Sequence, residues 1–383
     1  MIPYSKQSID SSDIEAVTVA LRSALITQGD IVPQFEAAVA QSVECKHAVA
    51  VASGTAALTV AYRALGIADG SLVWTVTNSF VATANAALYC GARVDFVDID
   101  PSTWNLHLPA LEAKLKRARD NDRIPDLLSV VHFGGLSCDM ESVAALAGEY
   151  GFKVVEDAAH ALGGSYRNRP IGCCEWSDAA TFSFHPVKSI TTGEGGIVVT
   201  NDPAVSQRVA LLRSHGIARN PEKWSSSDEG AWYYEQLELG WHCRLTDFQA
   251  ALGISQMKRL PAFIEARRAI AERYTRAFAG VGLGVRSMET VGESANHLFV
   301  VHLGKRTPRR RDIFDELRSR GIGVNVHYIP IHTHPFYRQL GFEVGMFPES
   351  ERFYAGALSL PIYPGLQTAE QDYVIDAVLA LID

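Results

Sequence analysis

The chain has 383 residues, of which 47% are hydrophobic and 20% charged, and its formal net charge is −8. At roughly 150 residues per domain this length predicts two domains, and such a chain can bury a large core without disulfides or metals. The composition excludes a disordered chain, and 35 Lys and Arg against 43 Asp and Glu argue against a general nucleic-acid binder, which would be basic.

The first 200 residues alternate apolar runs of strand length with segments of helical period. Strands are expected over 47–53, 72–76, 94–98, 128–132 and 153–156, with helices over 54–66, 79–91, 108–118 and 142–150 between them. This alternation is typical of a mostly parallel sheet that helices cover on both faces. Two further strands, 179–184 and 196–200, follow each other without a full helix between them. That break in the alternation predicts one antiparallel strand.

The rest of the chain has a different pattern. Residues 245–280 are largely helical in period, and Pro261 is expected to mark the joint between two helices. Beyond about residue 285, a small α+β unit is indicated by strand-like segments at 297–303 and 324–328 and by helices near 312–320 and 368–382. We therefore expect an α/β protein with a large domain over 1–250, whose residues 1–12 form an N-terminal arm, and a smaller α+β domain over 251–383.

Several features bear on the compartment. No segment approaches the ~18 apolar residues of a membrane span, and the N-terminus lacks the basic and apolar regions of a signal peptide. The six cysteines form no CxxC pair, and the adjacent Cys173 and Cys174 have poor geometry for a mutual disulfide. His327, His332 and His334 lack the further ligands of a metal site. We therefore expect a protein that has no membrane-spanning segment, binds no metal and works in the reducing cytoplasm.

Chemistry-bearing residues follow two of the predicted strands, at the ends where ligands gather in a parallel sheet. Ser53, Gly54 and Thr55 lie between the first strand and a helix, where small residues and free amides suit a phosphate. The alternative is a simple helix cap by Ser53 or Thr55. Asp157 ends a later apolar strand, with His160 three residues on, and its carboxylate could hold a protonated ring nitrogen. The alternative there is a turn cap.

A third segment, FSFHPVKSITTGEGG at 182–196, contains Lys188, the only Lys or Arg between Arg169 and Arg208. Partly apolar surroundings lower the pKa of a lysine, and the neutral amine can form a Schiff base with a carbonyl. An exposed loop lysine is the alternative. Together, a phosphate cradle, a carboxylate for a pyridinium nitrogen and a lysine for an aldehyde are the contacts that pyridoxal 5′-phosphate requires.

A resemblance extends over nearly the whole chain. The segments SGTAAL, SFVATANAALYCGA, FVDID, VVEDAAHALGG, FSFHPVKSITTGEGG, RSHGI, LGWHCRLTDFQAALG, VHYIPIH and LSLPIY occur in the order found in the DegT/DnrJ/EryC1/StrS sugar aminotransferases, which this sequence resembles. The resemblance implies an aspartate-aminotransferase-like (fold type I) α/β fold with a mostly parallel seven-stranded sheet. It also implies pyridoxal phosphate as the cofactor and a homodimer whose active sites are shared between the subunits.

The resemblance further implies roles for individual residues. Lys188 would form the Schiff base and then carry the reacting proton, and Asp157 would pair with the ring nitrogen. Further cofactor contacts are implied for Gly54, Thr55, Phe80, His160, Ser183 and His242. Nucleotide-sugar contacts are implied for Tyr4, Ile26, Thr27, Phe184, His327 and Tyr328. His242 stands where the family usually has an Asn of the second subunit, which is a departure from the family pattern.

Two segments, SFHPVKSITTGEGG and residues 233–260, most resemble the family's pseudaminic-acid pathway members. This implies L-glutamate as donor and a UDP-linked 4-keto sugar, UDP-2-acetamido-2,6-dideoxy-β-L-arabino-hexos-4-ulose, as acceptor. The alternatives are another 3- or 4-keto sugar on UDP, dTDP or GDP, a same-fold dehydratase in which His replaces the lysine, and a non-catalytic regulator with an added DNA-binding segment. A Rossmann dehydrogenase is disfavoured because no GxGxxG follows the first strand.

Overall fold

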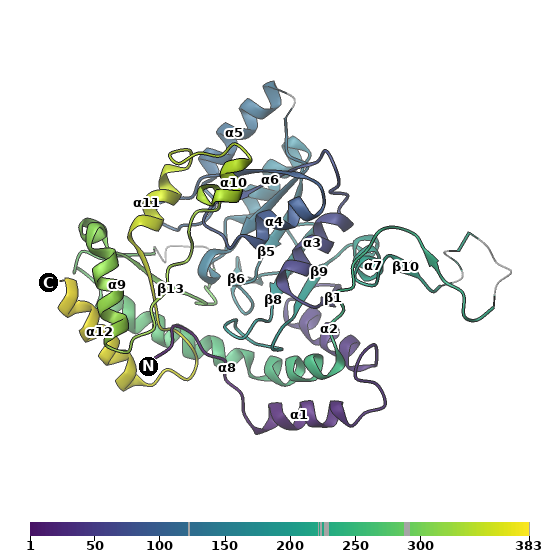
Figure 1. Ribbon diagram of the computed structural model, residues 1–383, viewed down its shortest axis with the longest axis horizontal. Helices are drawn as coiled ribbons and strands as arrows, with labels where there is room; N and C mark the ends of the chain where they lie inside the picture. The colour runs from purple at the N-terminus through teal and green to yellow at the C-terminus, as the bar shows by residue number, and fades with distance from the viewer. Residues whose placement is uncertain (122, 221, 223, 226–229, 287–291, 383) are drawn as a thin grey trace.

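The computed structural model describes residues 1–121, 123–220, 222, 224–225, 230–286 and 292–382. Its central sheet consists of β1 (His47–Val51), β2 (Leu72–Val76), β3 (Arg93–Val97), β4 (Leu127–Val131), β5 (Lys153–Asp157), β8 (Ala179–Ser183) and β9 (Gly196–Thr200). The strand order is β1-β9-β8-β5-β4-β2-β3 (Figure 1). β9 runs antiparallel to both of its neighbours, whereas the pairs from β8 to β3 are parallel. The predicted sheet with one antiparallel member is confirmed.

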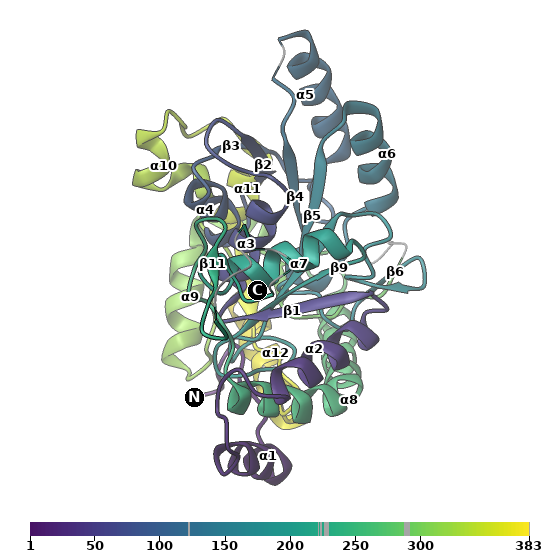
Figure 2. The same cartoon turned by 90° about the vertical axis from the view of Figure 1, so that its right-hand side faces the viewer.

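Helices cover both faces of this sheet because its strands are apolar on both sides. One face packs against α3 (Gly54–Ala64), α4 (Ala82–Tyr89) and α7 (Pro203–Leu212). The other packs against α2 (Ile31–Ser42), α5 (Leu108–Asp120), α6 (Met140–Tyr150) and α8 (Asp247–Ala277) (Figure 2). Successive residues of a strand point to opposite faces, so Val155 packs in the core beneath α3, α4 and α7 and Val154 in the core on the opposite face.

The helix α8 is continuous over 31 residues and contains Pro261. The predicted joint at Pro261 is therefore wrong. A proline inside a helix costs about 3 kcal/mol. Buried side chains on both sides of it, Leu260 and Ile264 in one core and Tyr274 in another, hold the helix in one piece. α8 contacts α2 and α1 (Ser11–Leu21), and its last turns belong to the C-terminal core. The division into two domains near residue 250 stays a prediction.

The C-terminal part contains a three-stranded antiparallel sheet of β12 (Gly284–Val285), β13 (Phe299–His302) and β14 (Ala357–Leu360). It carries α9 (Arg310–Ser319) and α12 (Thr368–Ile382), as predicted, together with α10 (Pro335–Gln339) and α11 (Pro348–Gly356). The predicted strand at 324–328 is wrong. In the part of the chain that the structure describes, this segment pairs through one bridge, Asn325–Ser359, and then leaves the sheet.

Three further features were not predicted. The helices α1 and α2 follow the first ten residues, and Asp10 caps α1 by accepting hydrogen bonds from Ser12 and Asp13. A ribbon of β10 (Ile217–Ala218) and β11 (Glu235–Gln236) extends away from the body (Figure 1). Short strands β6 (Ser165–Tyr166) and β7 (Arg169–Pro170) form a hairpin. Among the described residues, none of the helices has the length and hydropathy needed to span a membrane.

Candidate active site

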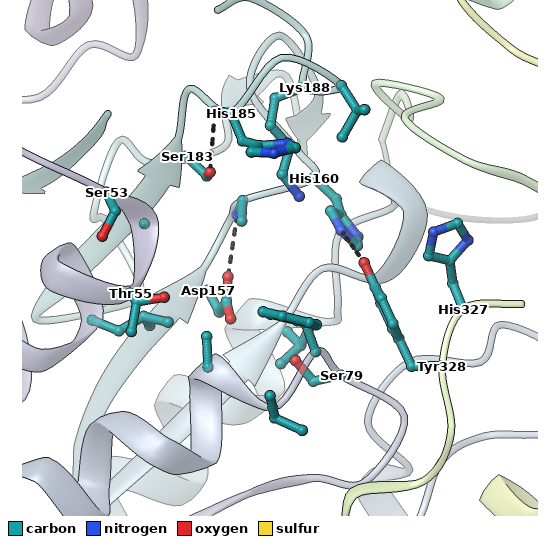
Figure 3. A pocket seen from close by; sticks show the side chains of 18 of the residues that line it. Ser53, Thr55, Ser79, Asp157, His160, Ser183, His185, Lys188, His327 and Tyr328 are labelled. Carbon is teal, nitrogen blue, oxygen red and sulfur yellow. Dashed lines mark hydrogen bonds between the residues drawn. The ribbon is translucent and has the colours of Figure 1, made fainter. Parts of the chain in front are cut away.

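A cavity of about 630 Å³ opens at the carboxyl ends of β1, β5 and β8. The three segments in which the sequence predicts chemistry meet around it (Figure 3). Tyr4 from the N-terminal arm and residues 325–329 from the C-terminal part also line it. The segment 325–329 is the one that leaves the small sheet after Asn325. A cavity of this size is typical of a small-molecule site.

The start of α3 forms one wall of the cavity. Ser53 caps the helix, and its Oγ accepts a hydrogen bond from the Ala56 amide at 3.1 Å. The amides of Gly54 and Thr55 belong to the first turn, so they have no acceptor within the helix. A Cβ on Gly54 would lie 2.8 Å from Cβ of Ser183, which excludes any side chain there. The result is a cradle of free amides beside the Ser183 hydroxyl, which suits a phosphate.

Asp157 is the last residue of β5 and is 7% exposed. Its Oδ1 accepts a hydrogen bond from the Ala159 amide at 3.2 Å, and its Oδ2 accepts one from Thr83 Oγ1 at 2.6 Å. The preceding acid, Glu156, points to the other face of the sheet and bonds to His132 and Ser177. Of the acidic pair that ends β5, Asp157 is the member in the cavity.

The loop after β8 places Lys188 in the cavity opposite Asp157 (Figure 3). Its amide donates to the His185 carbonyl at 2.9 Å, and Thr191 and Thr192 both donate to the Phe184 carbonyl, which fixes the loop. Burial lowers the pKa of Lys188 to about 8, although the charge of Asp157 acts in the opposite direction. A substantial fraction of the amine is therefore neutral near pH 8.

On the side of the cavity nearest the C-terminal part, the polar groups are neutral. The Gly134 amide donates to His160 Nδ1 at 3.2 Å, so the ring proton is on Nε2, which lies 3.1 Å from the Tyr328 hydroxyl. Burial, followed by the charge of Lys188, lowers the pKa of His160 well below its usual value and that of His327 to about 3. Burial also raises the pKa of Tyr328. These three side chains can orient a polar ligand without adding charge.

The structure brings most of the predicted site residues together. The cavity is lined by Tyr4, Gly54, Thr55, Phe80, Asp157, His160, Ser183, Lys188, His327 and Tyr328. The ring of Phe184 is instead fully buried, with its centroid 5.1 Å from that of Phe35. Ile26 and Thr27 are exposed on the loop between α1 and α2. His242 is also exposed, and its Nε2 accepts a hydrogen bond from Arg244 Nη2 at 2.9 Å. The contacts assigned to these residues stay predictions.

Several lining residues were missed by sequence reasoning. Ser79 follows β2 closely, so the rule that ligands gather at carboxyl ends could have found it. His185 lies inside the lysine segment, three residues before Lys188. Asn325 and His334 also line the cavity and come from the C-terminal part. Asn325 carried no signal in the sequence, and His334 was considered there only as one of three histidines of a metal site.

Comparisons with known proteins agree with this geometry. The model of the DegT/DnrJ/EryC1/StrS aminotransferase family matches residues 7–379. The chain belongs to this family. One relative of this aminotransferase is the spore coat polysaccharide biosynthesis protein SpsC of Bacillus subtilis, which is 39% identical over 100% of this chain and 97% of that protein.

Another relative is the UDP-4-amino-4,6-dideoxy-N-acetyl-beta-L-altrosamine transaminase of Campylobacter jejuni, 37% identical over 100% of this chain and 98% of that protein. A solved structure of Helicobacter pylori PseC, described as an aminotransferase involved in the biosynthesis of pseudoaminic acid, is also similar. It has a TM-score of 0.91 and 32% identity and covers 100% of this aminotransferase and 99% of that chain. These similarities confirm the predicted fold type I and the predicted aminotransferase activity with pyridoxal phosphate.

The site fits this cofactor. The phosphate fits the cradle at Gly54, which a Cβ would fill, and the Ser183 hydroxyl beside it. Asp157 has the charge to hold a protonated ring nitrogen, and Lys188 supplies an amine for the aldehyde. The donors therefore match the cofactor group by group, although the roles of the individual residues stay predictions.

The pKa of Lys188 leads to a pH-dependent prediction. Only the neutral amine reacts with the cofactor aldehyde, and its fraction rises about tenfold between pH 7 and pH 9 for a pKa of about 8. The rate constant for reloading the apoprotein with pyridoxal phosphate should therefore rise by that factor in stopped-flow absorbance measurements. An Asp157→Asn variant should shift the midpoint to lower pH, because the charge of Asp157 raises the pKa of Lys188. A flat profile over this range would contradict the assignment.

Proposed function

We propose that this aminotransferase moves an amino group from L-glutamate to the keto carbon of a nucleotide-linked deoxy sugar. The proposed acceptor is the 4-keto sugar UDP-2-acetamido-2,6-dideoxy-β-L-arabino-hexos-4-ulose, in pseudaminic acid biosynthesis. The observation that carries the proposal is the full-length similarity to the transaminase named for the altrosamine product, together with the TM-score of 0.91 to PseC. The comparable identity of SpsC supports a second candidate, a different nucleotide keto sugar at the same site.

The chemistry follows from the residues around the cavity. When bound, pyridoxal phosphate supplies an electron-withdrawing ring that stabilises the negative charge left when a substrate carbon loses a proton. Lys188 accepts that proton and returns it to a neighbouring atom, and a pKa of about 8 lets the amine do both near neutral pH. Asp157 holds the proton of the ring nitrogen. His160, Tyr328 and His327 orient the polar edge of the ligand as neutral groups.

The same cavity serves the donor and the acceptor. His327 and Tyr328 lie across the cavity from Ser53 and Thr55 (Figure 3), and the sugar is placed between them. One set of acid–base groups then acts in both half-reactions, so glutamate and the sugar bind in turn. Ping-pong kinetics are the expected result.

A second copy of the chain is part of the proposal, and we place the enzyme in the cytoplasm. Ile26, Thr27 and His242 lie outside the cavity of a single chain and are exposed. Other apolar side chains nearby on α1 and the following loop are exposed too, including Val19, which is 58% exposed, and Leu25, which is 57% exposed. The exposure of these apolar side chains supports a homodimer with shared sites, in which a partner would cover them. Light scattering should give twice the chain mass.

The substrate is tested with the cofactor in its amine form. The loaded enzyme is mixed with UDP, dTDP and GDP sugars that carry a 3- or 4-keto group, and absorbance is followed as the aldehyde form returns. We expect the fastest return with the UDP-linked 4-keto N-acetyl sugar, and an amino group at the fourth carbon of the product by NMR. Faster return with another sugar would favour the second candidate. No return with any sugar would contradict sugar amination.

A further inference from the structure

A short chain of hydroxyl groups leads to the Asp157 carboxylate. Thr83 Oγ1 lies 2.6 Å from Asp157 Oδ2, and Ser79 Oγ lies 2.6 Å from Thr83 Oγ1. Thr83 is fully buried, and Ser79, which lines the cavity, is 3% exposed. Both residues come from the segment at the start of α4, and Thr83 precedes Asp157 by 74 positions in the sequence.

Elementary hydrogen bonding fixes the direction of this chain. The Thr83 hydroxyl has one proton, and the oxygens near it are the Asp157 carboxylate and Ser79 Oγ, both at 2.6 Å, and the Phe80 carbonyl at 3.3 Å. The charged acceptor, Asp157, takes the proton. The Ser79 hydroxyl then donates to the remaining lone pair of Thr83. Proton donation therefore runs from Ser79 to Thr83 to Asp157.

The local structure of α4 accounts only for the longer contact of the Thr83 hydroxyl, the one to the Phe80 carbonyl at 3.3 Å. A threonine near the start of a helix usually serves the helix backbone, and α4 begins at Ala82 after the N-cap residue Val81, which provides no side-chain cap. The backbone of Thr83 is held separately, because the buried Tyr62 hydroxyl donates to the Thr83 carbonyl at 3.2 Å. The shorter contact of the hydroxyl is therefore the one to the Asp157 carboxylate, at 2.6 Å against 3.3 Å to the Phe80 carbonyl.

We propose that Thr83, supported by Ser79, is a positioning residue for Asp157. Thr83 occupies Oδ2 and the Ala159 amide occupies Oδ1, so the carboxylate has one orientation, and its remaining lone pairs are available to the cofactor ring nitrogen. A carboxylate that already accepts two hydrogen bonds also competes less for the proton of that nitrogen. The ring therefore keeps its proton. This inference rests on the proposed pairing of Asp157 with the ring nitrogen.

The test compares Thr83→Val, which removes the hydroxyl at nearly constant volume, with Thr83→Ser, which keeps it. NMR of an isotopically labelled ring nitrogen reports its protonation in the loaded enzyme, and fluorescence quenching gives the dissociation constant of pyridoxal phosphate. In Thr83→Val we expect a less protonated ring nitrogen and about tenfold weaker binding. Thr83→Ser should match the wild type. Ser79→Ala should show a smaller change in the same direction. It tests the same series of hydrogen bonds if Thr83→Val fails to fold.

Thr59→Val is the matched control, because Thr59 is also a buried helix threonine but donates to the Thr55 carbonyl in its own helix. It should leave the ring nitrogen unchanged. Unchanged protonation and affinity in Thr83→Val would overturn the proposal. Equal losses in Thr83→Val and Thr83→Ser would overturn it too, because Thr83→Ser keeps the hydroxyl and loss of the hydroxyl could then not explain the effect. Asp157→Asn separates the two ideas. If the ring nitrogen stays protonated in Asp157→Asn, the proposed pairing itself fails. If Asp157→Asn lowers the protonation and Thr83→Val does not, only the role of Thr83 is rejected.

Discussion

Replacement of Lys188 by alanine should lower the rates of both half-reactions by at least about 10,000-fold. In the proposed mechanism, the variant loses the amine that binds the cofactor aldehyde and the group that moves the proton. Among the described residues, the cavity lining contains no Lys or Arg other than Lys188, and its remaining basic side chains are histidines. His160 and His327 are poor substitutes, because burial lowers the pKa of each well below that of a free imidazole. Single-turnover absorbance with glutamate and with the keto sugar measures each half-reaction.

Two control variants separate the chemistry from the charge and from general stability. Lys188→Arg keeps a cation but lacks a nucleophilic amine, so it should be as inactive as alanine. Lys153→Ala removes a half-exposed lysine whose amine bonds to Asp178 on the surface, and it should be near wild type. Borohydride reduction followed by peptide mass mapping should find the cofactor on the peptide that contains Lys188. Normal turnover by Lys188→Ala would contradict the mechanism.

The parts of the site that could be predicted from the sequence lie close together along the chain. Lys188 was recognisable because it is a single cation within a run of strand residues and glycines. Asp157 was recognisable because an acid at the end of a buried strand needs a partner. The sheet could be predicted equally well, because continuous apolar strands separated by helices permit few architectures. In each case, a local pattern carried the information.

The rest depends on contacts between distant segments. The hydrogen bond from Thr83 to Asp157 exists because α4 and β5 meet at one edge of the sheet, and neither segment alone indicates it. Pro261 predicted a break in α8, but tertiary packing on both sides of the proline outweighed the local preference. Residues 324–328 have a strand-like pattern, yet only Val324 and His327 are buried, and residues 325–328 line the wall of the cavity. The pattern of residue types alone does not distinguish a strand from such a segment.

Replacement of Asp157 by asparagine should lower kcat about a thousandfold. The amide has no negative charge to hold the proton of the ring nitrogen, so the ring withdraws electrons less strongly when the substrate carbon loses its proton. The change also removes the charge that raises the pKa of Lys188, so the amine should titrate below pH 8. Steady-state rates measured across pH report both effects, as a lower maximum and as a shifted limb of the profile.

The neighbouring acid provides a matched control within the same strand. Glu156 is also buried, but its carboxylate accepts hydrogen bonds from Ser177 Oγ at 2.5 Å and pairs with His132 at 2.8 Å on the opposite face of the sheet. Glu156→Gln should therefore reduce the free energy of unfolding by about 2 kcal/mol while kcat changes only a few-fold. If both substitutions lowered kcat equally, the role of Asp157 would be structural. A large loss of kcat confined to Asp157→Asn assigns the charge at the end of β5 to the reaction, because the two acids share a strand and differ in the face to which they point.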